Sequence, residues 1–284
     1  MTIIARREAD GAMDRYAVVG QPVAHSLSPQ IHAAFAAELG IKLSYDAIEA
    51  PLDGFAATVA ELFGRGYLGV NVTVPFKAEA CAVAHQVDAA AARAEAANTL
   101  RVEADGRVTA FTTDGLGLVR DLMDHQGVDL RGRITLLLGA GGAAAGVIEP
   151  LLAAGVSEVV VANRTQARAE ALAARFAGLG PVRAAAVDAL PCADLVINAT
   201  AASLQGQAVP VSAEAVHRDT FVYDMMYGPK ARPFLERCAG LGIRGGVDGL
   251  GMLVEQAASA FQLWRGVRPS TTPVLARLRA AIGA

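Results

Sequence analysis

Cysteine is scarce in this sequence, and the motifs of zinc enzymes and serine hydrolases are absent. The three cysteines, Cys81, Cys192 and Cys238, lie far apart and form no CxxC pair or Cys/His cluster, which a zinc site or a redox pair would need. The five histidines form no HExxH motif, and there is no GxSxG sequence. We therefore expect reduced thiols, no bound metal and no serine nucleophile.

Long apolar runs and an excess of basic residues are also lacking. No stretch approaches the ~20 apolar residues of a membrane span, and the apolar run in "MTIIARREAD" is too short for a signal peptide. The net charge of −3 and the pI near 6.0 leave no basic field for nucleic acid or acidic membranes. We expect a cytoplasmic protein that binds small molecules, as a monomer or a homodimer.

The first part of the chain alternates apolar strands with helices. The chain of 284 residues, 53% of them hydrophobic, exceeds the usual domain size of roughly 100–150, so we expect two domains. Helices are predicted at 29–40 and 54–66, and strands at 16–20, 43–50 and 67–74. This order is typical of parallel strands with helical crossovers. Two alanine-rich helical stretches follow, one of them over 77–87, and then a hairpin that turns at Asp105-Gly106.

The pattern restarts at "RITLLLGAGGAAAG" and predicts a second α/β unit. Its expected strands lie at 134–138, 158–162, 193–198 and 220–224, with a weaker one at 182–187. No strand follows the last predicted helices, 249–265 and 272–282, so we expect them to pack on the first domain. The predicted fold class is α/β with two domains. Residues 1–113 plus 249–284 form a mostly parallel domain, and residues 114–248 form a Rossmann-type domain.

A glycine-rich turn between the first strand and helix of the second unit predicts dinucleotide binding. Gly139, Gly141 and Ala144 have the G-x-G-x-x-G/A spacing, which allows a tight turn, close approach of a pyrophosphate, and helix–strand packing. The helix N-terminus, at Gly142 and Ala143, would offer free N–H groups to the phosphates. The alternative is a turn that is rich in glycine and alanine only for packing. Pro150 would crowd the carbonyl of Gly146 in the same helix.

The second strand of this unit favours NADP over NAD. NAD enzymes place a carboxylate after this strand, whereas "EVVVANRT" ends in Asn163, Arg164 and Thr165, with Arg168 one turn further on. A guanidinium binds a 2′-phosphate bidentately, and a carboxylate would repel it. The alternative is a helix cap with solvated arginines.

Two serines in the first domain are candidates for binding a carboxylate. Ser26 and Ser28 lie two residues apart and share one face if the segment is extended. Ser28 also precedes Pro29, the position of an ordinary helix N-cap, so the two interpretations stay open. His25 and His32 are expected to serve local packing.

Lys77 and Asp114 occupy two further junctions between a strand and a helix. Lys77 comes two residues after Pro75 and opens a helical run, where most lysines are solvated. Asp114 ends "FTTD" before a helix, where an N-cap is the common role. Neither position alone establishes a function.

Taken together, these segments resemble the shikimate dehydrogenase family from Tyr16 to the C-terminus. The resembling stretches are "YAVVGQPVAHSLSPQIH", "GVNVTVPFK", "ANTL", "TDGLG", "LLLGAGGAAAGV", "ANRT", "LVINAT", "YDMMYGP" and "DGLGMLVEQAA". The resemblance implies NADPH-dependent reduction of 3-dehydroshikimate to shikimate in aromatic amino acid (chorismate) biosynthesis. It also implies two α/β domains, the first completed by C-terminal helices.

The resemblance also implies roles for individual residues. Lys77 and Asp114 correspond to the catalytic pair, in which the lysine protonates the ketone oxygen and the carboxylate orients the lysine. The substrate would contact Ser26, Ser28, Thr73, Asn98, Tyr227 and Gln256. The cofactor would contact Gly139, Gly141, Gly142, Ala143, Asn163, Arg164, Thr165, Arg168 and Gly249.

The sequence departs from the family at two positions near the expected site. Thr112 stands where the family usually has Asn, and Ala97 where it usually has Val. Relatives that act on quinate, or that prefer NAD, share the same overall pattern. A quinate/shikimate dehydrogenase with a relaxed choice of cofactor or substrate is therefore the alternative. A non-catalytic sensor that binds NADP or shikimate is a further alternative, against which the retention of Lys77 and Asp114 argues.

Overall fold

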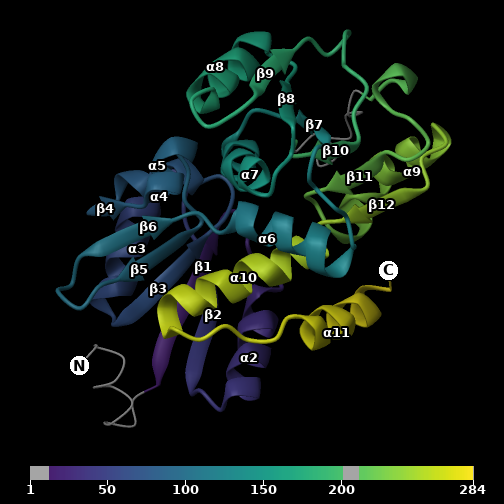
Figure 1. The fold of residues 1–284 in the computed structure, drawn as a ribbon. Coiled ribbons are helices and arrows are strands. Elements are labelled where there is room, and N and C mark those ends of the chain that lie inside the picture. Colours follow the sequence, from purple (N-terminus) through teal and green to yellow (C-terminus); the bar gives the residue numbers. More distant parts are fainter. Residues whose placement is uncertain (1–12, 201–210, 284) are drawn as a thin grey trace. The chain divides into compact units, whose positions relative to one another are not determined.

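Two six-stranded sheets organise the chain in the computed structural model, which describes residues 13–200 and 211–283. The chain divides into two compact units, each with its own sheet (Figure 1). The first contains the residues up to Gly117 and Leu253–Arg277, and the second contains Leu118–Met252 and the residues from Leu278. No helix in the described ranges is long and apolar enough to cross a bilayer. Residues 1–10, for which no signal peptide is expected, lie outside the described residues.

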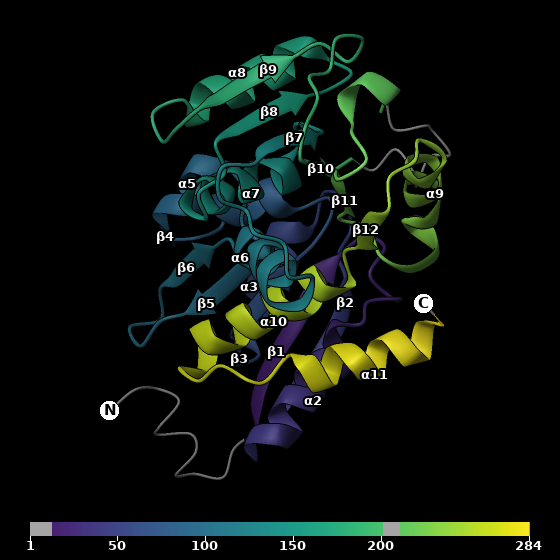
Figure 2. The ribbon, with the colours of Figure 1, turned by 45° about the vertical axis from the view of Figure 1, so that its right-hand side comes forward.

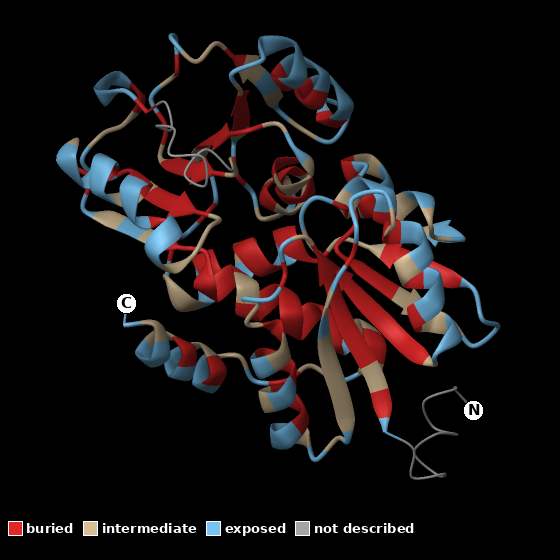
Figure 3. Ribbon diagram, turned by 180° about the vertical axis from the view of Figure 1, so that it is seen from behind, coloured by how far each residue is buried: buried red, intermediate tan, exposed pale blue. Residues whose placement is uncertain are grey.

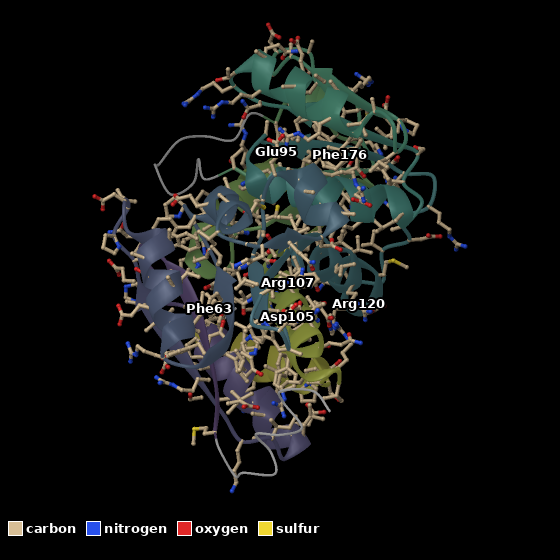
Figure 4. The ribbon with its side chains drawn as sticks, turned by 90° about the vertical axis from the view of Figure 1, so that its left-hand side faces the viewer. Phe63, Glu95, Asp105, Arg107, Arg120 and Phe176 are labelled. Atoms are coloured by element: carbon tan, nitrogen blue, oxygen red, sulfur yellow. The ribbon has the colours of Figure 1, made fainter. Side chains whose placement is uncertain are left out.

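The sheet of the first unit has the order β2-β1-β3-β5-β6-β4. Its strands are β1 (Asp14–Gly20), β2 (Leu43–Glu49), β3 (Tyr67–Val72), β4 (Gln86–Val87), β5 (Thr99–Val102) and β6 (Val108–Phe111). β1 pairs in parallel with β2 and β3, and the β5–β6 hairpin continues the sheet in antiparallel fashion. The predicted hairpin turn is confirmed, with Gly106 at φ 84°. Figure 4 labels the side chains of Asp105 and Arg107, which are hydrogen-bonded across this turn.

Helices cover both faces of this sheet, because alternate strand residues on either side are apolar. Ala17 and Val19 of β1 face a core that also contains apolar residues of α3 (Phe55–Gly64), α4 (Lys77–Ala82) and α5 (Ala89–Ala94). On the other face Tyr16 packs against Trp264 of α10 (Leu250–Arg265). α2 (Ser28–Leu39) lies beside the same strands, and α11 spans Thr272–Ile282 (Figure 1).

The predicted elements of the first part are confirmed, with two differences. α2 has Pro29 in its first turn, and Gly40 ends it at φ 65°, as expected from the sequence. The helix predicted over 77–87 stops at Ala82, and β4 follows at Gln86–Val87. A strand of two residues is too short to produce a periodic signal, so the sequence pattern missed it.

The indole ring of Trp264 leaves no room for a side chain at Gly69 of β3. A Cβ on Gly69 would lie 2.2 Å from Nε1 of Trp264, and this nitrogen donates a hydrogen bond to the carbonyl of Leu100 at 3.0 Å. We expect Gly69→Ala to lower the free energy of unfolding by about 1–3 kcal/mol, since the ring must move. Urea unfolding measures the loss. Gly64→Ala is the matched control, because a Cβ there meets nothing within 4 Å; equal losses in both variants would contradict the expectation.

His32 of α2 lies in an aromatic cluster on the same face. Its ring stacks on Tyr45 at a centroid distance of 4.2 Å and lies 5.4 Å from the ring of Trp264. The side chain is fully buried, and neither ring nitrogen has a hydrogen-bond partner among the described residues. Burial lowers the pKa of His32 to about 3, because desolvation disfavours the imidazolium. The expected packing role is confirmed for His32 but wrong for His25, which is exposed.

This burial of His32 predicts a loss of stability in mild acid. The unfolded imidazole takes up a proton near its ordinary pKa of about 6.5, whereas the folded one does so at about 3. Between these values the unfolded state binds the additional proton, so stability falls by up to about 1.4 kcal/mol per pH unit as pH decreases. Urea unfolding at about pH 7.5 and about pH 5 should show a smaller pH dependence for His32→Phe than for wild type. Identical pH dependence in the two proteins would refute this.

The sheet of the second unit is entirely parallel, with the order β12-β11-β10-β7-β8-β9 (Figure 2). Its strands are β7 (Ile134–Leu138), β8 (Glu158–Ala162), β9 (Val182–Ala185), β10 (Leu195–Asn198), β11 (Phe221–Asp224) and β12 (Gly245–Asp248). Its α-helices are α7 (Gly142–Ala153), α8 (Gln166–Phe176) and α9 (Arg232–Gly240). α6 (Asp114–Arg120) begins in the first unit and continues in the second into the π-helix η1 (Asp121–His125). Buried residues concentrate in β7, β8, β10 and β11; α8 and α9 expose their outer faces, whereas α7 is largely buried (Figure 3).

The predicted fold class is confirmed, since both sheets are mostly parallel and have helical crossovers. The five strands predicted for the second unit are present, but β12 was missed. Its sequence "GGVD" has one apolar side chain, and a Cβ on Gly246 would lie 2.5 Å from Cγ2 of Val222. Close packing against β11 therefore removes the apolar signal that the pattern needs. α7 runs through Pro150 to Ala153, and all three cysteines are free thiols as expected.

Candidate active site

One edge of the first sheet brings together segments that are distant in sequence. Val19 near the end of β1 pairs with Val72 at the end of β3, so the segments after these two strands leave the sheet side by side. β5 runs in the opposite direction and begins at Thr99, which pairs with Asn71 of β3 and Phe111 of β6. Asn98 and the residues after β6 therefore lie at this same edge.

Lys77 and Asp114 form an ion pair at this edge. Lys77 is the first residue of α4 and Asp114 the first of α6, and Nζ donates to Oδ2 at 2.5 Å. The two side chains are 18% and 9% exposed, respectively. The interpretation of Lys77 as a solvated surface charge is therefore wrong. The carboxylate of Asp114 bonds the side chains of Lys77 and Asn98, which is not the N-cap role.

Asn98 links this pair to Gln256 of α10. Its Nδ2 donates to Asp114 Oδ1 at 3.0 Å, and lies 2.9 Å from Thr113 Oγ1 and 3.1 Å from Gln256 Oε1. Its Oδ1 accepts from the backbone N–H of Thr113 at 2.7 Å. Asn98 and Gln256 are 3% and 8% exposed. The network holds the carboxylate of Asp114 through the neutral amide of Asn98 and leaves Lys77 as the most exposed polar group of the set.

The segment with Ser26 and Ser28 forms a turn and the start of a helix. Ser26 lies in a turn in which its N–H bonds Val23 O, and its Oγ accepts from the N–H of Ser28 at 3.2 Å. Ser28 is the first residue of α2 and is 5% exposed, while Leu27 holds the N-cap position without a side-chain bond. The segment is therefore not extended, which was the condition for the two serines to share one face, and the N-cap interpretation of Ser28 is wrong because Leu27 holds that position. Thr73, directly after β3, donates its N–H to Val19 O.

The glycine-rich turn lies at the carboxyl end of β7. Gly139 has φ 114°, and a Cβ there would lie 3.1 Å from the carbonyl oxygen of Ala199. Gly141 is exposed, and a Cβ there would meet nothing within 4 Å. The packing interpretation therefore explains Gly139 but not Gly141. α7 begins at Gly142, and its first intrahelical bond runs from Ala145 N–H to Gly141 O, so the N–H groups before Ala145 have no helical acceptor.

The segment after β8 lies beside this turn, because Ala162 pairs with Leu138 of β7. Asn163 Nδ2 donates to the carbonyl of Thr165 at 3.0 Å and so stabilises the bend. Thr165 holds the N-cap position of α8 but makes no side-chain cap bond. The capping interpretation is therefore wrong for Thr165. Arg164 and Arg168 are exposed. The segment after β8 therefore offers guanidinium groups, and residues 163–165 include no carboxylate.

Tyr227 lies in the second unit, in a loop that two carboxylates hold. Asp224 Oδ1 accepts from Met226 N–H at 2.8 Å, and Asp248 Oδ2 accepts from Gly228 N–H at 2.7 Å. Burial raises the pKa of Asp224 to about 6, because desolvation disfavours the carboxylate. Gly249 is explained by packing, since a Cβ there would lie 2.4 Å from the carbonyl oxygen of Met225. Its contact with a cofactor stays a prediction.

Sequence reasoning missed several polar residues that the structure builds into these networks. Asn71 and Thr99 are buried beside Asn98, and Asp224 and Asp248 end strands beside Tyr227. The available signal was a polar residue within or at the end of an apolar strand, as in "GVNV" and "FVYD". Across the described ranges, no group of three or more His, Cys, Asp or Glu side chains is arranged to hold a metal ion.

Three family models match most of the chain. Residues 18–100 match the shikimate dehydrogenase substrate binding domain, residues 121–222 match shikimate / quinate 5-dehydrogenase, and residues 249–279 match the shikimate 5′-dehydrogenase C-terminal domain.

Curated relatives and solved structures agree with these models. The chain is 51% identical to shikimate dehydrogenase (NADP(+)) of Thioalkalivibrio sulfidiphilus, over 94% of this chain and 98% of the relative. It is 53% identical to the enzyme of that name from Methylibium petroleiphilum, over 95% and 96%. A crystal structure of shikimate 5-dehydrogenase from Thermus thermophilus in complex with NADP(H) and shikimate aligns with a TM-score of 0.84 and 36% identity, covering 95% of this chain and 100% of the other.

Proposed function

The chain belongs to the shikimate dehydrogenase family, and from this premise we propose that it reduces 3-dehydroshikimate to shikimate, reversibly, with Lys77 and Asp114 as its catalytic pair. It is an NADP-dependent oxidoreductase that acts on a CH–OH group. The reaction belongs to aromatic amino acid biosynthesis. The single observation that carries the catalytic assignment is the 2.5 Å bond between Lys77 Nζ and Asp114 Oδ2.

Lys77 is proposed to donate the proton that the reaction requires. NADPH, when bound, supplies the hydride that converts the ring ketone to an alcohol. The ketone oxygen gains negative charge as the carbon is reduced, and an ammonium within hydrogen-bond reach both stabilises that charge and protonates the oxygen. Asp114 orients the ammonium through Oδ2 and is itself held through Oδ1 by Asn98. In the reverse direction Lys77 Nζ accepts the alcohol proton.

The glycine-rich turn fits the diphosphate of NADP. The open space over Gly141 and the N–H groups of the first turn of α7 supply the backbone donors that a pyrophosphate needs. Gly142 and Ala143 would provide these donors. The segment Asn163-Arg164-Thr165, with Arg168, would bind the adenosine 2′-phosphate, because it offers guanidinium groups and no carboxylate.

The substrate carboxylate is proposed to bind Ser26 and Ser28, with a further contact from Tyr227. Thr73, Asn98 and Gln256 would contact the ring hydroxyls. Thr73 and Asn98 lie at the edge of the sheet at which β1 ends, and the segment with Ser26 and Ser28 follows β1, which supports this assignment. We also propose that residues 1–113 plus 249–284 form one domain and residues 114–248 the other. The cytoplasmic location and the state of monomer or homodimer remain predictions.

A quinate/shikimate dehydrogenase with a relaxed choice of cofactor or substrate is the second candidate function. The match of residues 121–222 to a shikimate / quinate model favours it, as does Thr112, which stands two residues before Asp114 in place of the usual Asn. A substitution so close to the carboxylate can change which ring substituents fit.

A matrix of two substrates and two cofactors tests the proposal. Purified enzyme is assayed at 340 nm for oxidation of shikimate and of quinate, each with NADP and with NAD. We expect the highest kcat/KM for shikimate with NADP. Comparable values for quinate would favour the second candidate. Binding of NADP or shikimate without turnover in any combination would favour a sensor and would refute the catalytic proposal.

A further inference from the structure

Four hydrogen bonds lead from the phenol of Tyr45 to the carboxylate of Asp114. The Tyr45 hydroxyl donates to Asn71 Oδ1 at 2.7 Å, and Asn71 Nδ2 donates to Thr99 Oγ1 at 3.0 Å. Thr99 Oγ1 then donates to Asn98 Oδ1 at 3.3 Å, and Asn98 Nδ2 donates to Asp114 Oδ1 at 3.0 Å. We call these five residues the Tyr45–Asp114 chain. Every donor in it points toward Asp114.

The direction of each bond follows from partners that can act in only one way. The backbone N–H of Thr113 donates to Asn98 Oδ1, and the backbone carbonyl of Asn98 accepts from Asn71 Nδ2 at 3.1 Å. These two contacts fix both amide orientations, because a backbone N–H only donates and a carbonyl only accepts. Thr99 accepts from Asn71 and so directs its single hydroxyl proton to Asn98.

Tyr45 is fixed as a donor by its surroundings. Burial raises the pKa of Tyr45 well above its ordinary value, so the phenol keeps its proton at neutral pH. Its ring is held by stacking on His32 at 4.2 Å. The start of the Tyr45–Asp114 chain therefore has a fixed position and a fixed proton.

The middle of the Tyr45–Asp114 chain is buried where β3 pairs with β5. Asn71, Asn98 and Thr99 are 5%, 3% and 0% exposed, and every residue of β3 is buried. Buried polar groups destabilise a core unless they are fully hydrogen-bonded. A purely structural role would require only that these groups satisfy one another. The Tyr45–Asp114 chain instead ends at the carboxylate that accepts a hydrogen bond from Lys77 Nζ.

We propose that Thr99 and Asn71 are positioning residues for the Lys77–Asp114 pair, acting through the amide group of Asn98. The inference rests on the proposed function, since it concerns the same reaction. The Thr99 hydroxyl holds Asn98 Oδ1 on one side, so that Nδ2 on the other side faces Asp114 Oδ1. Aligned donors polarise one another, which strengthens the last bond to the carboxylate. Asp114 is thereby kept where Oδ2 orients the Lys77 ammonium.

Two substitutions at Thr99 separate positioning from packing. Thr99→Val removes the hydroxyl and keeps the shape, whereas Thr99→Ser keeps the hydroxyl and removes a methyl group. We expect Thr99→Val to lower kcat for shikimate oxidation roughly ten-fold, with KM changed less than about three-fold. Thr99→Ser should keep kcat within about two-fold of wild type. Melting temperatures of both variants report the structural effect separately.

A double-mutant cycle shows whether Thr99 acts through Asp114. In an Asp114→Asn background, Thr99→Val should lower the residual kcat less than about two-fold, because the carboxylate it positions is gone. Full additivity of the two losses would overturn the inference. So would an unchanged kcat in Thr99→Val, or equal losses in Thr99→Val and Thr99→Ser.

Tyr45→Phe is the second variant, for use if Thr99→Val does not fold. It removes only the hydroxyl that holds Asn71 Oδ1 and keeps the ring that stacks on His32. Because Asn71 then loses its first donor, we expect kcat to fall about two- to five-fold; an unchanged kcat overturns the inference. A wild-type enzyme that does not oxidise shikimate would overturn the proposed function and this inference with it. An active wild type with unaffected variants overturns the inference alone.

Discussion

Lys77→Ala is expected to lower kcat for shikimate oxidation by roughly 10²–10⁴ and to raise KM much less. The reason is that Nζ acts on the oxygen that changes charge during the reaction, so its loss affects the transition state more than substrate binding. Steady-state kinetics with NADP in both directions measure the effect. The side chain is 18% exposed and paired with Asp114, so we expect the variant to fold.

Lys42→Ala is the matched control for Lys77. Lys42 is exposed between α2 and β2, and its replacement should leave kcat within about two-fold of wild type. The melting temperatures of the two variants are compared with that of wild type, so that a loss of turnover through misfolding is recognised. Turnover of Lys77→Ala equal to that of wild type would remove Lys77 from the mechanism.

The alternation of apolar strands and helices was sufficient to predict both units, because parallel strands with helical crossovers have strong periodic signals. β4 and β12 fell outside that signal, one because it has two residues and the other because glycines replace its side chains. The N-terminal turn at Ser26 was also missed, since nothing in the local sequence distinguishes it from an extended segment.

The contact between Lys77 and Asp114 depends on topology rather than on local pattern. The two residues are 37 positions apart, and they meet because the β5–β6 hairpin returns the chain to the edge at which β3 ends. Composition and spacing marked each residue only as a junction between a strand and a helix. The resemblance to a family supplied their pairing. The first three residues of the Tyr45–Asp114 chain, Tyr45, Asn71 and Thr99, could not be predicted in this way, because each looks like an ordinary strand residue in the sequence.

Arg164→Ala is expected to raise KM for NADP roughly 10- to 100-fold while changing KM for NAD less than about three-fold. Only NADP carries the 2′-phosphate, and Arg164 is exposed directly after β8, at the edge where the glycine-rich turn leaves β7. The bond from Asn163 to the Thr165 carbonyl keeps the bend in place without the arginine side chain. The expected loss is therefore assigned to the missing guanidinium, and the melting temperature of the variant reports any change in the loop.

Shikimate oxidation by wild type and variant, each with NADP and with NAD, measures this selectivity. Arg218→Ala is the control, because Arg218 is an exposed arginine that precedes β11 and so lies at the opposite edge of the parallel sheet. It should leave both KM values within about two-fold of wild type. Equal losses for NADP and NAD in Arg164→Ala would mean that the arginine contacts a part common to both cofactors, and the assignment of the 2′-phosphate to it would be wrong.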